Sequence, residues 1–248
     1  LDKRTELRWY ADASPMKRRR LQLASIALTL LVFFGTMLIG HWSVRYPQVI
    51  HQDLYLHRLT KAGEKPQKRL RLVFFSDLHI GEAIQRAVDL VQAQHPDLIL
   101  CGGDYIDHRY VYAYEPRVIK IMQRLKAPLG VYFVPGNHEY RDDLDKSLAY
   151  PAQIGATLLR DSIVYPGDSL LALIGRDDWV NGDRKPFTEI TSEVQAGGRP
   201  AILFEHTPVS IDSLASSSVD LMLCGHTHGG QLWPGMLLTW WKYGLSSG

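Results

Sequence analysis

The sequence is short of cysteine, with only two such residues among 248. Two cysteines cannot form the disulfide framework that holds small secreted domains together, so that class of protein is excluded. Cys101 and Cys224 each stand at the end of an apolar run, where we expect both thiols to be buried in a core. Cysteine usage leaves the cellular compartment open.

Beyond its N-terminus the sequence also lacks an excess of positive charge. The net charge is +2, but residues 1–20 hold seven Lys or Arg and three Asp or Glu, which leaves 21 basic and 23 acidic residues in the remaining chain. Proteins that bind nucleic acid usually present a basic surface to the phosphate backbone. The slightly acidic balance after residue 20 therefore predicts no nucleic-acid partner.

Residues 21–40 form a long apolar run, LQLASIALTLLVFFGTMLIG, without a single charged residue. About 20 such residues span the hydrocarbon core of a bilayer as a helix, so we expect a transmembrane helix here. One alternative is a buried helix of a soluble protein, which is usually shorter or has a polar face. Another is a cleaved secretory signal, but no small-residue cleavage site follows the run.

The charges around this run predict its orientation. Four basic residues stand immediately before it at 17–20, whereas only Arg45 follows within the next fifteen or so positions. Basic residues next to a membrane helix tend to stay in the cytoplasm. We expect a single-pass protein of the cytoplasmic (inner) membrane whose main domain lies on the outer, periplasmic face. A later basic group at residues 61–71 argues against this orientation.

The chain divides into four predicted segments: a basic N-terminal segment at 1–20, the transmembrane helix at 21–40, a connector at 41–69, and a domain at 70–248. Trp42 and Tyr46 in the connector suit the membrane interface. In the domain, apolar runs alternate with helical patterns, which predicts an α/β fold with parallel strands covered by helices. Strands are expected at 70–76, 98–101, 131–134, 157–160, 170–174, 201–204 and 221–224. Helices are expected at 82–94, 116–125 and 142–154. The first of these helices has Ala83, Ala87, Leu90 and Val91 on one face. Because the later strands are closely spaced, we expect a second, more mixed sheet.

Histidine and acidic residues follow the predicted strands. Each group stands just after an apolar strand, and ligands of open α/β sheets bind at the carboxyl ends of strands. The residues in question are Asp77, His79, Asp104, Asp107, Asn137, His138, His206, His226 and His228. Five separate segments of the chain could therefore meet at one site.

This set of side chains has the chemistry of a metal site. Imidazole and carboxylate ligands together suit Zn, Mn or Fe, and two such ions a few ångströms apart form a common site for phosphate-ester hydrolysis. In Asp77-x-His79 and His226-x-His228, residues two apart on extended backbone would point the same way. Each motif alone has an ordinary structural explanation. Chance does not readily explain five such motifs that each follow a predicted strand.

The motifs resemble those of the calcineurin-like metallophosphoesterases. They are SDLH at 76–79, GGDYID at 102–107, GNHE at 136–139, His206 in FEHTP, and GHTHGGQ at 225–231. The sequences SDLHIG and GHTHGGQLWP are similar to those of the bacterial branch of this family that has N-terminal membrane segments. The resemblance runs from about residue 70 to the C-terminus. It implies a four-layer α-β-β-α sandwich, here preceded by one transmembrane helix.

The resemblance also implies a role for each site residue. Asp77, His79 and His228 would hold a first divalent ion, Asn137, His206 and His226 a second, and Asp104 would bridge them. His138 would lie near the leaving-group oxygen, with Asp107 orienting it. Members of the family usually continue for at least one more strand beyond the last motif. We therefore expect the chain to be truncated at its C-terminus, with an unpaired sheet edge.

The expected reaction is hydrolysis of a phosphoester, most simply a phosphodiester, in one step by metal-bound hydroxide. Arg109, Arg141 and Arg176 are candidate phosphate contacts, although solvated surface arginines are the simpler interpretation. The membrane helix and a tail with Trp233, Trp240 and Trp241 suggest an amphipathic or lipid-linked phosphoester. The alternative for these tryptophans is an interfacial or core role in a missing C-terminal element. The alternatives are a pyrophosphate hydrolase of the UDP-2,3-diacylglucosamine type in lipid A synthesis, a nucleic-acid phosphodiesterase, disfavoured by charge, and a non-catalytic metal-binding scaffold.

Overall fold

The computed structural model describes residues 13–56, 69–81, 83–107, 110–141, 143–169, 171–194, 199–215, 217–230 and 235–244. The chain forms two compact units, Leu1–Pro47 and Gln48–Gly248. The basic residues at 61–68, and also Glu82, Arg109, Asp142, Gln231 and Trp233, lie outside the described residues.

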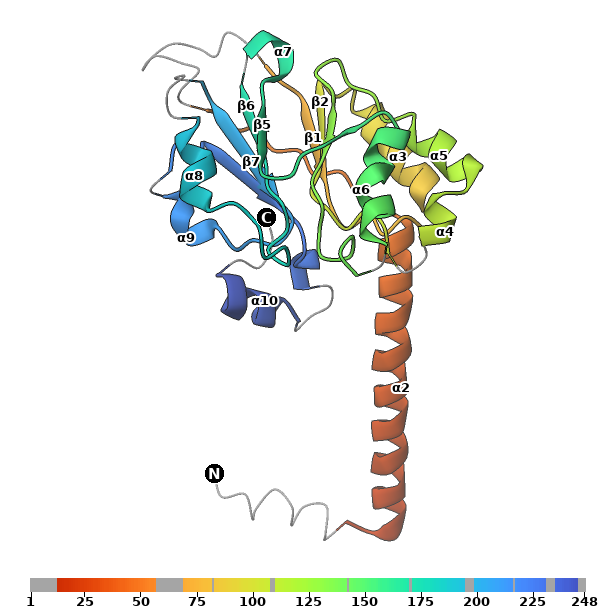
Figure 1. The fold of residues 1–248 in the computed structure, drawn as a ribbon. Helices are drawn as coiled ribbons and strands as arrows, with labels where there is room; N and C mark the ends of the chain where they lie inside the picture. Colours follow the sequence, from red (N-terminus) through yellow and green to blue (C-terminus); the bar gives the residue numbers. More distant parts are fainter. Residues whose placement is uncertain are drawn as a thin grey trace. The chain divides into compact units, whose positions relative to one another are not determined.

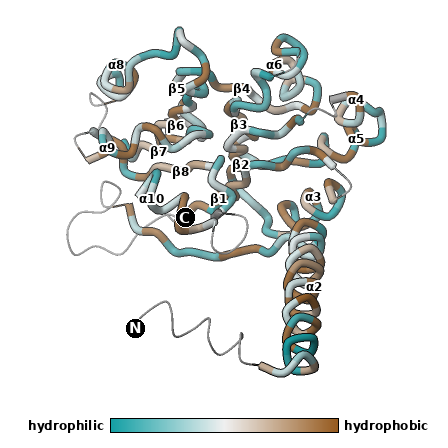
Figure 2. The backbone as a smooth tube through the Cα atoms, turned by 90° about the horizontal axis from the view of Figure 1, so that it is seen from below, coloured by the Kyte–Doolittle hydropathy of each residue, from teal (hydrophilic) through white to brown (hydrophobic). Residues whose placement is uncertain are grey.

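The first unit is dominated by one helix, α2 (Pro15–Arg45), which contains the predicted transmembrane run. The helix begins at Ser14, whose side chain accepts a hydrogen bond from the backbone N–H of Lys17, and Pro15 follows at the first helical position. None of its residues is buried, and apolar residues cover most of its length (Figure 2). By length and composition it can cross a membrane.

The structure changes one boundary in this region. The helix continues beyond residue 40 to Arg45, so the first residues of the predicted connector are helical. At its end the rings of Trp42 and Tyr46 stack, with centroids 4.2 Å apart. The pair lies at the C-terminal end of the apolar helix, and its place at a membrane interface stays a prediction.

The second unit begins with a parallel sheet, as the alternation of strands and helices predicts. The strands are β1 (Leu72–Phe75), β2 (Leu98–Cys101), β3 (Val131–Phe133) and β4 (Thr157–Leu158), in that spatial order. Helices α3 (Ile84–Ala93), α5 (Pro116–Met122) and α6 (Leu144–Gln153) connect them, with a short α4 (Tyr110–Ala113) before α5. Phe75 pairs with Cys101 and Cys101 with Phe133, so the carboxyl ends of these strands are level.

A second sheet follows and is mixed, as predicted. Its order is β5 (Ser162–Val164), β6 (Ala172–Gly175), β7 (Ala201–Glu205) and β8 (Leu221–Cys224), with β5 antiparallel to β6 and the other pairs parallel. The remaining helices are short: α7 (Pro166–Ser169), α8 (Phe187–Ser192), α9 (Ile211–Leu214), the 3₁₀ turn η3 (His228–Gly230) and α10 (Gly235–Tyr243).

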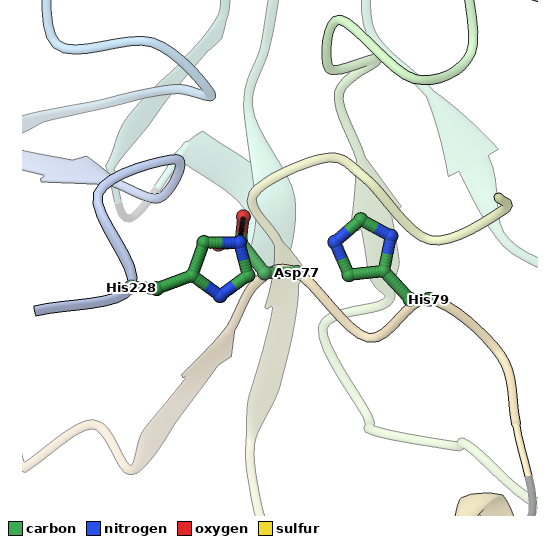
Figure 3. A group of neighbouring side chains, drawn as sticks. All are labelled: Asp77, His79 and His228. Atoms are coloured by element: carbon green, nitrogen blue, oxygen red, sulfur yellow. Dashed lines mark ion pairs between the residues drawn. The ribbon is translucent and has the colours of Figure 1, made fainter. Parts of the chain in front are cut away.

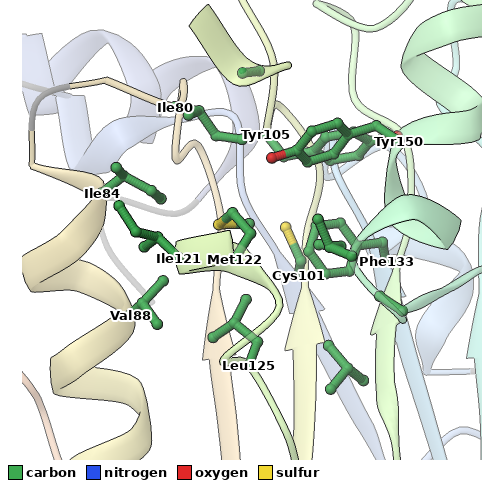
Figure 4. Packing of buried hydrophobic residues seen from close by; sticks show 14 of the residues in the cluster. Ile80, Ile84, Val88, Cys101, Tyr105, Ile121, Met122, Leu125, Phe133 and Tyr150 are labelled. Atoms are coloured by element: carbon green, nitrogen blue, oxygen red, sulfur yellow. The ribbon is translucent and has the colours of Figure 1, made fainter. Parts of the chain in front are cut away.

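The two sheets pack face to face, with helices on each outer face (Figure 1). Alternate residues of one strand serve two cores: Ile99 and Cys101 face α3 and α5, whereas Leu98 and Leu100 face the second sheet. Figure 4 shows the outer core, where Met122 and Ile121 of α5 pack beside Cys101. A third core lies between the second sheet and α8. The predicted four-layer α-β-β-α sandwich is therefore confirmed.

Two packing predictions were only partly right. Of the predicted face of α3, Val91 is buried and Ala83, Ala87 and Leu90 are half-buried. The other buried residues of the helix are Ile84 and Val88. The helical period allows several neighbouring stripes, and α5 decides which one is covered. Cys101 is fully buried in central β2, but Cys224 is only half-buried because β8 lies at the edge of its sheet.

Candidate metal centre

The predicted site residues lie in the loops that follow β1, β2, β3, β7 and β8. Backbone hydrogen bonds join the first two loops: the N–H of Asp77 donates to the carbonyl of Gly103, and that of His79 to the carbonyl of Asp104, both at 3.0 Å. The last loop is joined to the first, because the N–H of His226 donates to Asp77 Oδ2 at 3.0 Å. The five chain segments therefore meet at one end of the two sheets.

One group of side chains consists of Asp77, His79 and His228 (Figure 3). Nε2 of His228 lies 3.2 Å from Oδ1 of Asp77, and the rings of His79 and His228 are parallel with centroids 5.7 Å apart. Ligand atoms of the three residues lie within 4.8 Å of one another. This is the trio that the resemblance assigns to the first ion.

A second group consists of Asp104, His206 and His226. Oδ2 of Asp104 lies 3.1 Å from Nε2 of His206, and Oδ1 of Asn137 lies 3.2 Å from the same nitrogen and 2.9 Å from Nδ1 of His226. Nδ1 of His206 donates to the carbonyl of Gly102 at 2.8 Å, since a carbonyl can only accept. That bond directs Nε2 into the group, as is typical of histidine ligands.

Asp104 lies between the two groups. Its Oδ2 is 4.0 Å from Nε2 of His79 and 3.1 Å from Nε2 of His206. Its Oδ1 accepts the backbone N–H of His138 at 2.9 Å, which fixes the orientation of the carboxylate. A carboxylate so placed can contribute an oxygen to each side.

The backbone of the site is unusual. Seven described non-glycine residues have positive φ, and five of them are site residues: Asp77, His79, Asp104, His226 and His228. Such left-handed conformations cost about 1–3 kcal/mol each and concentrate at functional sites. The expectation that the pairs Asp77-x-His79 and His226-x-His228 lie on extended backbone was therefore wrong. His226 and His228 point to different groups, because the chain turns between them.

Burial and neighbouring charges shift the pKa of three histidines of the site. Burial lowers the pKa of His79, and it also lowers the pKa of His226, assisted by the neighbouring His206. Burial likewise lowers the pKa of His206, but the hydrogen bond and charge of Asp104 outweigh it and raise that pKa to about 9. Neutral imidazoles are metal ligands, and an ion at His206 would displace its proton.

The residues fit divalent transition-metal ions. The donor set combines imidazole nitrogens with carboxylate and amide oxygens, the chemistry that Zn, Mn and Fe accept. Nδ1 of His79 is buried and has no hydrogen-bond partner among the described residues. A buried polar atom without a partner is costly, and a metal ion nearby would make use of such a nitrogen.

His138 stands at the rim with two polar partners. Its Nδ1 donates to Oδ1 of Asp107 at 2.9 Å, and its Nε2 accepts from Nη1 of Arg141 at 2.9 Å. Nε2 also lies 3.8 Å from Oδ2 of Asp104. The structure thus brings His138 and Asp107 together as predicted, and adds Arg141 as a neighbour.

Sequence reasoning missed Glu139. Its fully buried carboxylate accepts the backbone N–H groups of Asp104 at 2.9 Å, Ile106 at 2.9 Å and Gly136 at 2.7 Å. Burial, followed by the charge of Asp104, raises the pKa of Glu139 to about 8, against the pull of these donors. The residue ties two site loops together. Its only signal in the sequence is its place as the last letter of GNHE.

Arg176 is neither a phosphate contact nor a solvated arginine. It is buried, lies 2.7 Å from Oδ1 of Asp161 and donates to the carbonyl of Lys185 at 2.8 Å. The position directly after β6 places it inside the second sheet's end, where its charge is paired. Arg141 is exposed beside His138, and Arg109 lies outside the described residues.

Clusters of histidine and carboxylate side chains at the strand ends of a four-layer α/β fold are typical of metal-dependent hydrolases. The chain belongs to the calcineurin-like phosphoesterase family, whose family model matches residues 70–230. This membership supports the expected enzyme class, a metal-dependent phosphoester hydrolase.

Relatives of this chain are metallophosphoesterases. An uncharacterized metallophosphoesterase of Helicobacter pylori is 30% identical over 201 residues, which cover 77% of this chain and 51% of the relative. One from Aquifex aeolicus is 29% identical over 214 residues, covering 80% and 77%. A "transmembrane protein with metallophosphoesterase domain" of Bos taurus is 27% identical over 245 residues, covering 88% and 52%. The chain spans about half the length of the first curated relatives it matches.

Two solved structures with a similar arrangement are nucleotidases. The NAD nucleotidase of Haemophilus influenzae has a TM-score of 0.45 and 17% identity, covering 64% of this chain and 43% of that one. The 5'-nucleotidase precursor of Thermus thermophilus has a TM-score of 0.48 and 20% identity, covering 64% and 42%.

Proposed function

We propose that this hydrolase acts on a phosphodiester at a pair of divalent transition-metal ions, Mn, Fe or Zn. The observation that carries the proposal is Asp104, whose Oδ2 lies near Nε2 of both His79 and His206, one from each ligand group. Single-ion sites have no need for a carboxylate between two sets of ligands.

In this proposal Asp77, His79 and His228 hold one ion, Asn137, His206 and His226 hold the other, and Asp104 serves both. Two such ions would activate a water molecule and neutralise charge on the phosphate oxygens. The protein contributes rigid placement: Gly102 fixes His206 and Glu139 fixes the backbone of Asp104. Rigid placement matters because the ligands must not reorganise during the reaction.

His138 is the residue we assign to the leaving group. Its Nδ1–H is held by Asp107, and this hydrogen bond fixes the orientation of the ring. In the structure Nε2 accepts from Arg141, so donation to a leaving oxygen requires Arg141 to move away and Nε2 to bind a proton from solvent first. The freed guanidinium would then be available to a phosphate oxygen.

We further propose that α2 anchors the enzyme in a membrane. The support is its length of 31 residues, which contains the uncharged run at 21–40, and relatives in Bos taurus and Danio rerio that are named as transmembrane proteins. The basic residues at 17–20 favour a cytoplasmic N-terminus and a metal centre on the other side. A lipid-linked phosphoester would suit this setting.

The test combines metal content with substrate choice. The purified full chain should contain two transition-metal ions and lose activity with chelator, and Asp104→Asn should lower the occupancy of both ions. Asp89→Asn, the same change on the exposed face of α3, is the control and should keep both. One ion or none in active protein would overturn the proposal. Assays with phosphomonoesters, phosphodiesters and UDP-2,3-diacylglucosamine would then identify the substrate class.

A further inference from the structure

Helix α10 has an unusual distribution of side chains, because its large apolar residues are exposed. Its half-buried residues are Gly235, Thr239 and Tyr243, spaced four apart on one face, and this small or polar face lies against the protein. The large apolar side chains point outward and are exposed: Met236, Leu237, Leu238, Trp240 and Trp241. Leu238 is 70% exposed and Trp241 is 80% exposed. A surface helix of a soluble protein buries its apolar stripe, so this pattern needs an apolar partner.

The inner face of α10 rests on the metal centre. The helix packs against η3, which contains His228, and the ring of Tyr243 meets the ring of His226 edge to face at 6.2 Å and 87°. Both histidines belong to the ligand groups described above. Helix α10 therefore borders the site, and Figure 1 shows it below the strands of the second sheet.

The composition of α10 indicates which partner covers it. Residues 235–244 contain no acidic residue, and their only cation is Lys242 at the end, whose Nζ lies over the ring of Tyr243 at 4.8 Å. Tryptophan with a terminal lysine is typical of the boundary between lipid headgroups and acyl chains. Helices that lie in this boundary present Trp and Leu on one face.

The membrane anchor makes such a contact effective. Because α2 would hold the chain at the bilayer, α10 meets the lipid surface at high effective concentration, and even weak interfacial binding becomes persistent. A second copy of the chain is the weaker candidate, since Lys242 is the only charged residue of α10 and one charge cannot specify pairing.

We propose that α10 lies in the interfacial layer of the bilayer and holds the metal centre beside the lipid headgroups. The inference rests on the proposed membrane anchor. In this proposal lipid covers the outer face of α10, from Met236 to Trp241. It also implies that substrates reach the site along the membrane surface, as phosphoesters that remain attached to a lipid.

Nitroxide labels at three positions test this in the full chain reconstituted in nanodiscs of phosphatidylcholine and phosphatidylglycerol. Leu238→Cys reports on α10, and Leu31→Cys, in the middle of α2, reports on the anchor. Tyr165→Cys is the control, because this exposed residue follows β5 at the opposite end of the second sheet. The unsubstituted chain, with buried Cys101 and half-buried Cys224, is the labelling blank.

Accessibility to oxygen and to a water-soluble nickel chelate separates the outcomes. The proposal expects labels at 31 and 238 to favour oxygen, the former more deeply, and the label at 165 to favour the nickel chelate. Access of the chelate to 238 while 31 stays in lipid would overturn the inference and leave the anchor standing. Shielding of 238 from both reagents would mean that protein covers α10, which also overturns it. Access of the chelate to 31 would overturn the anchor itself.

Discussion

The buried carboxylate of Glu139 accepts a hydrogen bond of 2.9 Å from the backbone N–H of Asp104. The same oxygen accepts the N–H of Gly136 at 2.7 Å, so one side chain holds the loops after β2 and β3 together. Asp104 in turn lies between the two ligand groups. The geometry of the metal centre thus depends on a residue that need not touch a metal.

Glu139→Gln should destabilise the protein. The amide replaces an acceptor oxygen by an NH₂ group facing backbone donors, and a buried donor without an acceptor costs about 1–3 kcal/mol. For a domain of this size the melting temperature should fall by about 2–12 °C. Thermal unfolding of the chain in detergent micelles measures this. Glu189→Gln, on the exposed face of α8, is the matched control, and an equal effect of both changes would contradict the assignment.

Gly136→Ala should disable the site. A Cβ at this position would lie 2.3 Å from Oδ1 of Asp104 and 2.7 Å from Cγ of His206, so both ligands would have to shift. Misplacement of catalytic groups by about 1 Å can cost 10²-fold, and we expect at least that loss in kcat/KM. Gly182→Ala is the control, since no atom lies within 4 Å of its added Cβ. Wild-type activity and metal content in Gly136→Ala would refute the described geometry.

His138→Ala should separate catalysis from metal binding. If His138 serves the leaving group, both ions should remain, and the rate should fall by about 10²–10⁴-fold. The loss should be larger for aryl esters whose leaving phenol has a high pKa. Asp107→Asn should act in the same direction but more weakly, because it acts through His138. A loss independent of the leaving group would argue against this role.

Arg176→Ala should reduce stability without changing substrate binding. The substitution leaves Asp161 buried without its partner, which costs about 3–5 kcal/mol in comparable buried pairs. Denaturant titration should show the loss, while KM of the remaining folded enzyme should be unchanged. Arg124→Ala breaks an exposed pair with Asp89 and should have little effect. A rise in KM for Arg176→Ala would restore the phosphate-contact hypothesis.

The orientation in the membrane can be measured with a reporter that is active only in the cytoplasm. Four basic residues at 17–20 precede α2's apolar run, so a reporter fused after Arg71 should give no signal. A fusion before residue 17 serves as the positive control. Strong activity after Arg71 would place the metal centre on the cytoplasmic side and favour the UDP-2,3-diacylglucosamine alternative.

Much of the fold was predictable because its signals are local. Apolar runs mark β1, β2, β3, β6, β7 and β8, and the alternation with helical periods determines the parallel sheet. The short β5, α4 and α7–α10 were not predicted. Helices α4, α7 and α9 have four residues each, about one turn, which is too short to show a helical period. The membrane run was evident from composition alone.

The sequence by itself determined which residues stand at the strand ends, because Asp, Asn and His directly follow apolar runs, and the order of its motifs determined the family. Only the tertiary structure decided their partners: His228 beside Asp77, Asp104 between two groups, and Glu139 beneath them. The same holds for the burial of Arg176 and the outward apolar face of α10. The physical reason is distance along the chain. These contacts join residues far apart in sequence, and whether a charge is paired or a hydrophobic face is covered depends on the neighbours that packing brings to it.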